Sequence, residues 1–423
     1  MKMFFRFVPL SFFFIFLFTS ASLLSAKELE ALKNSKVAVI GDSITEQKLY
    51  ARFIELYLTV CQPQLGTSSF QYGWSGEKAV GFLSRMDLDL DFYRPTFATL
   101  CYGMNDGLYK PFDATVGDAY EKPLVQIVQK LKKNGAFVVV GGPGAVDSFY
   151  FKRIPSEVYN QNLEKLSEIA KKIAADNQFP YADVHGTMME VMAKAKAALG
   201  NEYEVGGGDG IHPQSNGHLI MAYAFLKAMN FDGDLGTITL DYKGESKGVN
   251  GHQVKSFTGG KAEIESTRYP FCFSGDKTSP KYALSILPYL PFNRDLNRVT
   301  FIVKNAPAPK LSVKWGDQSK TYSREDLEKG INLADEFIPN PFNDSFDKMS
   351  EQILQKEAYE TDWIKTIYRG FRVLGQKFPG DQEVAAATSV LDKKAGEKWN
   401  SYSKEIKASV KPINHTIIVE AVP

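Results

Sequence analysis

The stretch VAVIGDSITEQ, residues 37–47, begins with four apolar residues and continues with a glycine, an aspartate and a serine. A short apolar run that ends in a glycine-bearing loop is typical of a strand buried on both faces of a parallel sheet. Two later runs, Thr96–Cys101 and Phe137–Val140, have the same form, and segments with helical spacing of apolar residues separate the runs. Residues 35–232 therefore predict an α/β fold with a central parallel sheet, and a ligand site beyond the carboxyl ends of its strands.

Ser43 stands where the first strand gives way to the first helix. A hydroxyl at that edge of the sheet is placed as a nucleophile would be, beside a helix amino terminus that favours negative charge. The alternative is a helix cap, because serine caps many helices. A nucleophilic serine also needs a base, so the sequence must supply one elsewhere.

The candidate base is His212, in the loop GGGDGIHPQSNGH at residues 206–218. Asp209 precedes it by three residues, a spacing that lets the carboxylate turn back onto the imidazole and stabilise its protonated form. The alternative is a surface histidine beside a helix-capping aspartate. Of the other histidines in this half of the chain, we expect His185 to be structural and His218 to lie inside a helix.

Two further loops offer donors for the oxyanion of a tetrahedral intermediate. Gly76, in YGWSGEKA at residues 72–79, has a bare backbone N–H, and Asn105, in YGMNDG at residues 102–107, has a side-chain amide. Each loop could equally be an ordinary turn. With the N–H of Ser43, they would make three donors.

These residues occur in four blocks along the chain, and the blocks resemble those of the SGNH (GDSL) hydrolase superfamily. The blocks are Gly41-Asp42-Ser43, Gly76, Gly103-x-Asn105-Asp106 and Asp209-x-x-His212. The resemblance covers about residues 35–232, with Ile44 as a conservative departure from the family's leucine.

The resemblance implies a flavodoxin-like three-layer sandwich around a central parallel sheet. It also implies that Ser43 attacks the substrate, that His212 acts as base and then acid, and that Asp209 orients the imidazole. The oxyanion would be held by Ser43 N–H, Gly76 N–H and Asn105.

Other chemistries find less support in the sequence. No G-x-S-x-G motif occurs, which argues against an ordinary α/β-hydrolase. GGPG at residues 141–144 lacks the lysine and hydroxyl residue of a phosphate loop, so we interpret it as another strand-end loop. No histidine, cysteine and carboxylate cluster has the spacing of metal ligands, so we expect neither a metal nor another cofactor.

The charge balance and length limit the partners and the domain count. Lysine and arginine number 50 against 49 aspartate and glutamate residues, so nucleic acid is not an expected partner. A chain of 423 residues is longer than most single domains, and we expect two units. The three cysteines, Cys61, Cys101 and Cys272, are too few and too far apart for a disulfide framework and are expected in or near the core.

Residues 1–26 have the pattern of a secretory signal peptide, with Lys2 and Arg6 before a phenylalanine-rich run and small residues near Ala26. The sequence thus predicts a secreted or periplasmic protein with no stable membrane insertion after cleavage. An uncleaved membrane anchor is the alternative.

The chain is divided by these patterns into a catalytic domain at residues 27–235 and a C-terminal appendage at residues 236–423. TITLDY, KAEIES, RVTFIVK and KLSVKW predict a small antiparallel β unit, and SREDLEKG, residues 345–378 and residues 383–409 predict helices. The last eight residues, TIIVEAVP, predict a strand that returns to the β unit.

The expected function is that of a secreted serine hydrolase that cleaves carboxylic esters through an acyl-enzyme on Ser43. Export and the lack of a lid-like amphipathic insertion favour a soluble carbohydrate acetyl ester, so the partner is a small-molecule or polysaccharide ester. A lipase or thioesterase of the same fold is one alternative. Another is a non-catalytic surface or glycan-binding protein, if aromatic residues such as Trp315, Trp363, Tyr368 and Phe371 stack on sugars. The helical spacing of Ile364, Ile367, Tyr368 and Phe371 instead favours a core role.

Overall fold

The computed structural model describes residues 27–422, so the predicted signal peptide at residues 1–26 lies outside the described residues. Five strands form a sheet in the order β2-β1-β3-β4-β5, and every neighbouring pair is parallel. This is the flavodoxin-like strand order, which confirms the predicted fold class. The strands are β1 (Lys36–Gly41), β2 (Ser68–Gln71), β3 (Phe97–Cys101), β4 (Phe137–Gly141) and β5 (Tyr181–Ala182).

Helices cover both faces of this sheet. Successive side chains of a strand point to opposite faces, and the strands are apolar on both, so each face needs a covering layer. Val37 and Val39 of β1 lie in one hydrophobic core with α3 and α8. Ala38 and Ile40 lie in a second core with α4 and α5. The helices of this unit are α2 (Ser43–Glu46), α3 (Tyr50–Leu56), α4 (Ala79–Tyr93), α5 (Ala114–Lys133), α6 (Ser156–Asn177), α7 (Val184–Leu199) and α8 (Ser215–Ala228).

The direction of winding reverses between β1 and β3, which are neighbours in the sheet although β2 separates them in sequence. The loops that leave their carboxyl ends diverge to opposite sides, and ligands of such sheets bind in the resulting crevice. Ser43 follows β1 and Asn105 follows β3. The fold therefore brings the first and third sequence blocks to one edge of the sheet.

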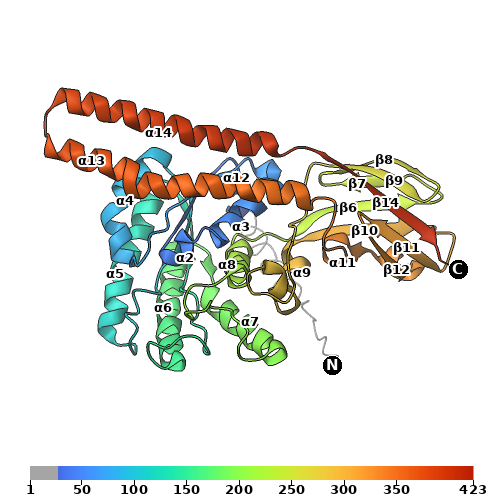
Figure 1. The fold of residues 1–423 in the computed structure, drawn as a ribbon, viewed down its shortest axis with the longest axis horizontal. Coiled ribbons are helices and arrows are strands. Elements are labelled where there is room, and N and C mark those ends of the chain that lie inside the picture. Colours follow the sequence, from blue (N-terminus) through green and yellow to red (C-terminus); the bar gives the residue numbers. More distant parts are fainter. Residues whose placement is uncertain (1–26, 423) are drawn as a thin grey trace, which may run out of the picture.

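Beyond α8 the chain forms two further sheets, at the right of Figure 1. One has the order β13-β10-β6-β7 and the other the order β12-β11-β14-β9-β8. Their strands are β6 (Asp234–Asp241), β7 (Lys247–Val249), β8 (His252–Thr258), β9 (Lys261–Ser266), β10 (Arg298–Lys304), β11 (Lys310–Trp315), β12 (Gln318–Ser323), β13 (Ile331–Asn332) and β14 (Ile413–Ala421).

The prediction of one small antiparallel unit is wrong in one respect, because β6 and β10 pair in parallel. Parallel neighbours need a long connection, and the chain between them makes β7, β8 and β9 and then η3 (Ala283–Tyr289) and α9 (Phe292–Leu296) before it returns. The predicted return of the C-terminus is confirmed, since β14 lies between β9 and β11.

Short helices lie between the last strands. Ser323 caps α10 (Arg324–Lys329), as the motif SREDLEKG predicts, by accepting a hydrogen bond from Asp326 N–H. Asn332 caps α11 (Leu333–Glu336) and also donates to two backbone carbonyls, so it is a structural residue.

Three long helices leave the β sheets and return across the α/β unit, at the top of Figure 1. They are α12 (Asn343–Asp362), continued through the π-helical turn η4 (Trp363–Ile367), then α13 (Tyr368–Lys377) and α14 (Gln382–Ser409), and they confirm the predicted helical segments. Trp363 and Tyr368 are buried in the core shared with α4 and α5, and Trp315 is buried in the β sheets. These aromatic residues are therefore core residues.

Helix α12 closes one edge of the parallel sheet. Glu360 accepts a hydrogen bond of 2.9 Å from Gln71 N–H, and Lys356 donates one of 2.8 Å to Ser69 C=O. Both groups belong to β2, the edge strand, whose free backbone would otherwise be a site for pairing with another chain. The C-terminal region thus covers the edge of the parallel sheet, and the domain boundaries at residues 27–235 and 236–423 stay predictions.

The three cysteines are buried and unpaired, as expected. Over residues 27–422, none of the helices has both the length and the apolar character needed to cross a membrane.

Candidate active site

Ser43 is the first residue of α2, and its hydroxyl does not cap the helix. The cap is Asp42, whose Oδ1 accepts a hydrogen bond of 2.9 Å from Ile44 N–H. The interpretation of Ser43 as a helix cap is therefore wrong, and its Oγ is available for another partner.

That partner is His212. Ser43 Oγ lies 2.8 Å from His212 Nε2, although 169 positions separate the two residues. His212 Nδ1 lies 2.6 Å from Asp209 Oδ2. The structure thus brings Ser43, His212 and Asp209 into one chain of hydrogen bonds at the carboxyl edge of the sheet.

The loop of Asp209 holds its carboxylate in place. Asp209 Oδ1 accepts hydrogen bonds of 2.9 Å from Ile211 N–H and His212 N–H. Partial burial opposes ionisation, but the hydrogen bonds from the His212 ring and from these backbone groups lower the pKa of Asp209. An ionised Asp209 favours the His212 tautomer that has its proton on Nδ1 and a free lone pair on Nε2 facing Ser43.

The two other histidines near the site have structural roles, as expected. His185 is buried with Nδ1 3.2 Å from Gly144 C=O. His218 is buried in α8, where its Nδ1 accepts from Tyr50 N–H, and burial lowers its pKa to about 3. Neither imidazole faces Ser43.

The predicted oxyanion donors lie in loops that contact the residues around Ser43. Asn105 Nδ2 is 3.1 Å from Glu77 C=O and 3.5 Å from Asp42 Oδ2, so its amide joins the loops that follow β1 and β2. Tyr109 O–H donates to Asn105 Oδ1 at 3.2 Å and so fixes which end of the amide is the donor. Gly76, next to Glu77, has a φ of +72°, a left-handed backbone conformation that favours glycine.

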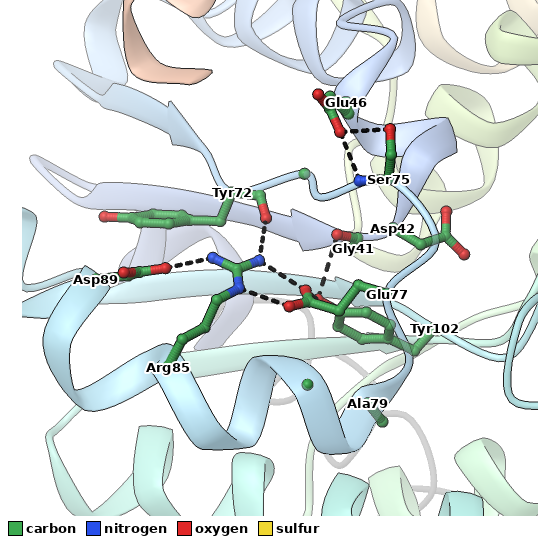
Figure 2. A network of polar contacts seen from close by, with 12 residues as sticks. Gly41, Asp42, Glu46, Tyr72, Ser75, Glu77, Ala79, Arg85, Asp89 and Tyr102 are labelled. Carbon is green, nitrogen blue, oxygen red and sulfur yellow. Dashed lines mark hydrogen bonds and ion pairs between the residues drawn. The ribbon is translucent and has the colours of Figure 1, made fainter. Parts of the chain in front are cut away.

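A buried ion network, shown in Figure 2, holds Glu77, the residue that directly follows Gly76. The guanidinium of Arg85 donates two hydrogen bonds of 2.7 Å to Glu77 and one of 2.8 Å to Tyr72 C=O, and it pairs with Asp89. Tyr102 O–H donates to Glu77 at 2.7 Å. No sequence pattern predicts this network, because the only signal is the spacing of Arg85 and Asp89 on a helix, which also suits an exposed pair.

Two buried carboxyl groups, those of Asp42 and Asp106, lie close to Asn105. Burial raises the pKa of Asp42 to about 7, with a contribution from the charges of Asp106 and Glu77. Asp106 accepts hydrogen bonds from Ala79 N–H at 3.0 Å and Gly103 N–H at 3.1 Å, and burial still raises its pKa to about 6. Asp106 therefore fixes the start of α4 and the turn after β3 relative to each other.

The chain matches a known protein family over part of its length. Residues 39–220 match the GDSL-like Lipase/Acylhydrolase family. An acetylxylan esterase from Geobacillus stearothermophilus is 24% identical over 220 residues, which are 47% of this chain and 94% of that protein.

Solved structures with the same fold include a gut microbial diltiazem-metabolizing enzyme, with 20% identity and a TM-score of 0.72. The match covers 92% of this chain and 98% of that one, so it extends over the C-terminal sheets and helices. The acetylxylan esterase Axe2 from Geobacillus stearothermophilus matches 47% of this chain and 95% of its own, with 21% identity and a TM-score of 0.40.

Proposed function

We propose that this chain, whose residues 39–220 belong to the GDSL-like lipase/acylhydrolase family, removes acetyl groups from carbohydrates through an acyl-enzyme on Ser43. Membership of this family makes the chain a carboxylic ester hydrolase. The observation that supports the mechanism is the hydrogen-bond chain from Ser43 Oγ through His212 to Asp209.

In the first half-reaction, Ser43 Oγ attacks the ester carbonyl carbon while His212 Nε2 takes the hydroxyl proton. Asp209 stabilises the imidazolium that forms. The tetrahedral intermediate then collapses, the C–O bond to the sugar breaks, and His212 returns the proton to the departing sugar hydroxyl. Water, deprotonated by the same imidazole, attacks the acyl-enzyme in the second half-reaction and releases acetate.

The oxyanion of both intermediates would be held by Ser43 N–H, Gly76 N–H and Asn105 Nδ2. Such donors stabilise charge that develops only in the transition state, and each typically contributes about 10²–10³ in rate. Tyr109 and the buried Arg85 network keep two of these donors in place, so they would act without touching the substrate.

The preference for acetyl groups rests on the openness of the site. The side chains of His212 and Asp209 are 35% and 51% exposed, and the loops at residues 102–113 and 142–155 contain no helix that could cover Ser43. A long acyl chain needs buried apolar surface to bind, at about 0.8 kcal/mol per methylene. An exposed site instead suits a short acyl group on a large polar alcohol, and acetylxylan is the substrate named for the curated relative.

A second candidate is an esterase for more apolar esters. Leu108, Phe112 and Phe149 lie in those same two loops and are partly exposed. They could contact an apolar leaving group or acyl chain, and this observation favours the lipase alternative.

The test compares acetate release from acetylated xylooligosaccharides with hydrolysis of 4-nitrophenyl acetate, octanoate and palmitate. Ser43→Ala and His212→Ala should each reduce turnover by about 10³-fold or more. Ser148→Ala, in an exposed loop on the same side of the sheet, should leave turnover unchanged. Faster hydrolysis of octanoate or palmitate than of the acetylated sugars would favour the second candidate, and equal rates for wild type and Ser43→Ala would exclude a Ser43 acyl-enzyme.

The proposal includes export to the periplasm or the medium, on the basis of the pattern in residues 1–26. Amino-terminal sequencing of the exported protein would test it, with a new terminus near Ala26 as the expected result.

A further inference from the structure

The C-terminal helices contact the loop that contains Gly76 through a chain of polar contacts. Lys365, in the turn η4, pairs with Glu46 Oε1. The other oxygen, Glu46 Oε2, accepts hydrogen bonds from Ser75 N–H at 2.5 Å and from Ser75 O–H at 2.6 Å, as Figure 2 shows. We call this set of Lys365, Glu46 and Ser75 the Glu46 bridge.

The Glu46 bridge joins two parts of the candidate active site. Glu46 is the last residue of α2, the short helix that begins with Ser43. Ser75 directly precedes Gly76, so its position sets that of the peptide N–H proposed to bind the oxyanion. Gly73 lets the same loop pack closely against α2, because the Cβ of any other residue there would lie only 2.2 Å from Glu46 N.

The bridge depends on the charge of Lys365. Burial acts against ionisation of Glu46, but the hydrogen bonds from Lys365 and Ser75 lower its pKa. Among the residues that the structure describes, Lys365 is the one cation paired with Glu46. Without Lys365, we expect the Glu46 carboxylate, whose side chain is only 18% exposed, to turn toward solvent and break its hydrogen bonds to Ser75.

A second contact reinforces the first. Lys365 Nζ lies 5.0 Å from the centre of the Trp74 ring, and the guanidinium of Arg369 lies 4.8 Å from it. Trp74 precedes Ser75 in the same loop, so cation–π contacts from the C-terminal helices act on the neighbouring residue as well.

From these contacts we infer that Lys365 is a positioning residue for the oxyanion loop, supplied from outside the part of the chain that matches the hydrolase family. The inference rests on the proposed function. Lys365 does not touch the reacting atoms; it holds Glu46, which holds the Ser75–Gly76 peptide in the geometry that the transition state requires.

The experiment measures kcat and KM for 4-nitrophenyl acetate, together with the urea midpoint, on the full chain. Lys365→Met should lower kcat about 10-fold with KM within about twofold, less than the loss of a whole donor because the N–H remains but is displaced. Lys365→Arg, which keeps the cation, should recover most of kcat. Glu46→Gln should add little to Lys365→Met in the double variant, because both break the same bridge.

Arg372→Met is the matched control. Arg372 lies in α13 and joins the same helices to α4 through Asp91, away from the Gly76 loop. It should lower the urea midpoint without changing kcat. A kcat for Lys365→Met equal to that of wild type, or equal losses of kcat in Lys365→Met and Arg372→Met, would overturn the inference.

Ser43→Ala in the same assay separates the two hypotheses. If Ser43→Ala and wild type hydrolyse the ester equally, the proposed function fails. If Ser43→Ala is inactive and Lys365→Met is fully active, only the role of Lys365 fails.

Discussion

Arg85→Met removes the cation at the centre of the network beneath the Gly76 loop. The side chains of Arg85, Glu77 and Asp89 are 2%, 7% and 0% exposed, so the variant leaves two buried carboxylates without their ion-pair partner. Breaking one buried ion pair typically costs about 3–5 kcal/mol. Because a typical domain is stable by about 5–15 kcal/mol, we expect a loss of roughly half the free energy of unfolding.

Urea unfolding followed by circular dichroism measures this change, with Arg94→Met as the control. Arg94 forms an exposed pair with Asp91, at 78% and 46% exposure, and its loss should cost less than about 1 kcal/mol. The triple variant Arg85→Met, Glu77→Gln, Asp89→Asn removes the unpaired charges and should regain part of the stability. The reasoning is refuted if Arg85→Met and Arg94→Met are destabilised by the same amount.

Two further variants test the site and the β sheets. Gly76→Ala and Gly135→Ala each place a Cβ in open space at a positive φ, +72° and +84°, so both variants should lose about 1 kcal/mol of stability. Only Gly76→Ala should also lower kcat, by about 10-fold. Equal kcat values for the two variants would argue against Gly76 as a donor. Burial lowers the pKa of His252 to about 4 and that of His415 to about 3, so protonation favours the unfolded chain. Between pH 6.5 and pH 4 each histidine should therefore subtract about 3 kcal/mol from the free energy of unfolding, while the raised pKa values of Asp42 and Asp106 act in the opposite direction. The difference in the free energy of unfolding between wild type and His252→Gln isolates one histidine and should change by about 3 kcal/mol over this range; a difference that does not vary with pH would contradict the prediction.

The sequence indicated the candidate site because each of its residues stands at the end of a predicted strand or in a glycine-rich loop. Ser43, Asn105 and Gly76 follow β1, β3 and β2, and the carboxyl ends of parallel strands meet at one edge. The pairing of Ser43 with His212 then follows from the fold. The sequence did not distinguish which residue caps α2, because Asp42 and Ser43 are both good caps and only the backbone geometry separates them.

Sequence patterns did not predict the buried ion pairs that hold the loops of the site in place. Arg85 and Glu77 are eight residues apart across a loop and a helix, and Lys365 and Glu46 are 319 positions apart. Charged residues are usually exposed, so their types alone do not indicate burial. The parallel pairing of β6 with β10 was missed for a related reason, since a short apolar strand does not encode the direction of its neighbour.

The loop with Gly76 is therefore fixed from two sides by different parts of the chain. Arg85, within the α/β unit, holds Glu77 on one side of Gly76, and Glu46, paired with Lys365 of the C-terminal helices, holds Ser75 on the other. The same helices cover the edge of β2, the strand that leads into this loop. Because the residues on both sides of Gly76 are held by separate contacts, we expect the orientation of the Gly76 N–H to be set before substrate binds. This is what preorganised stabilisation of an oxyanion requires.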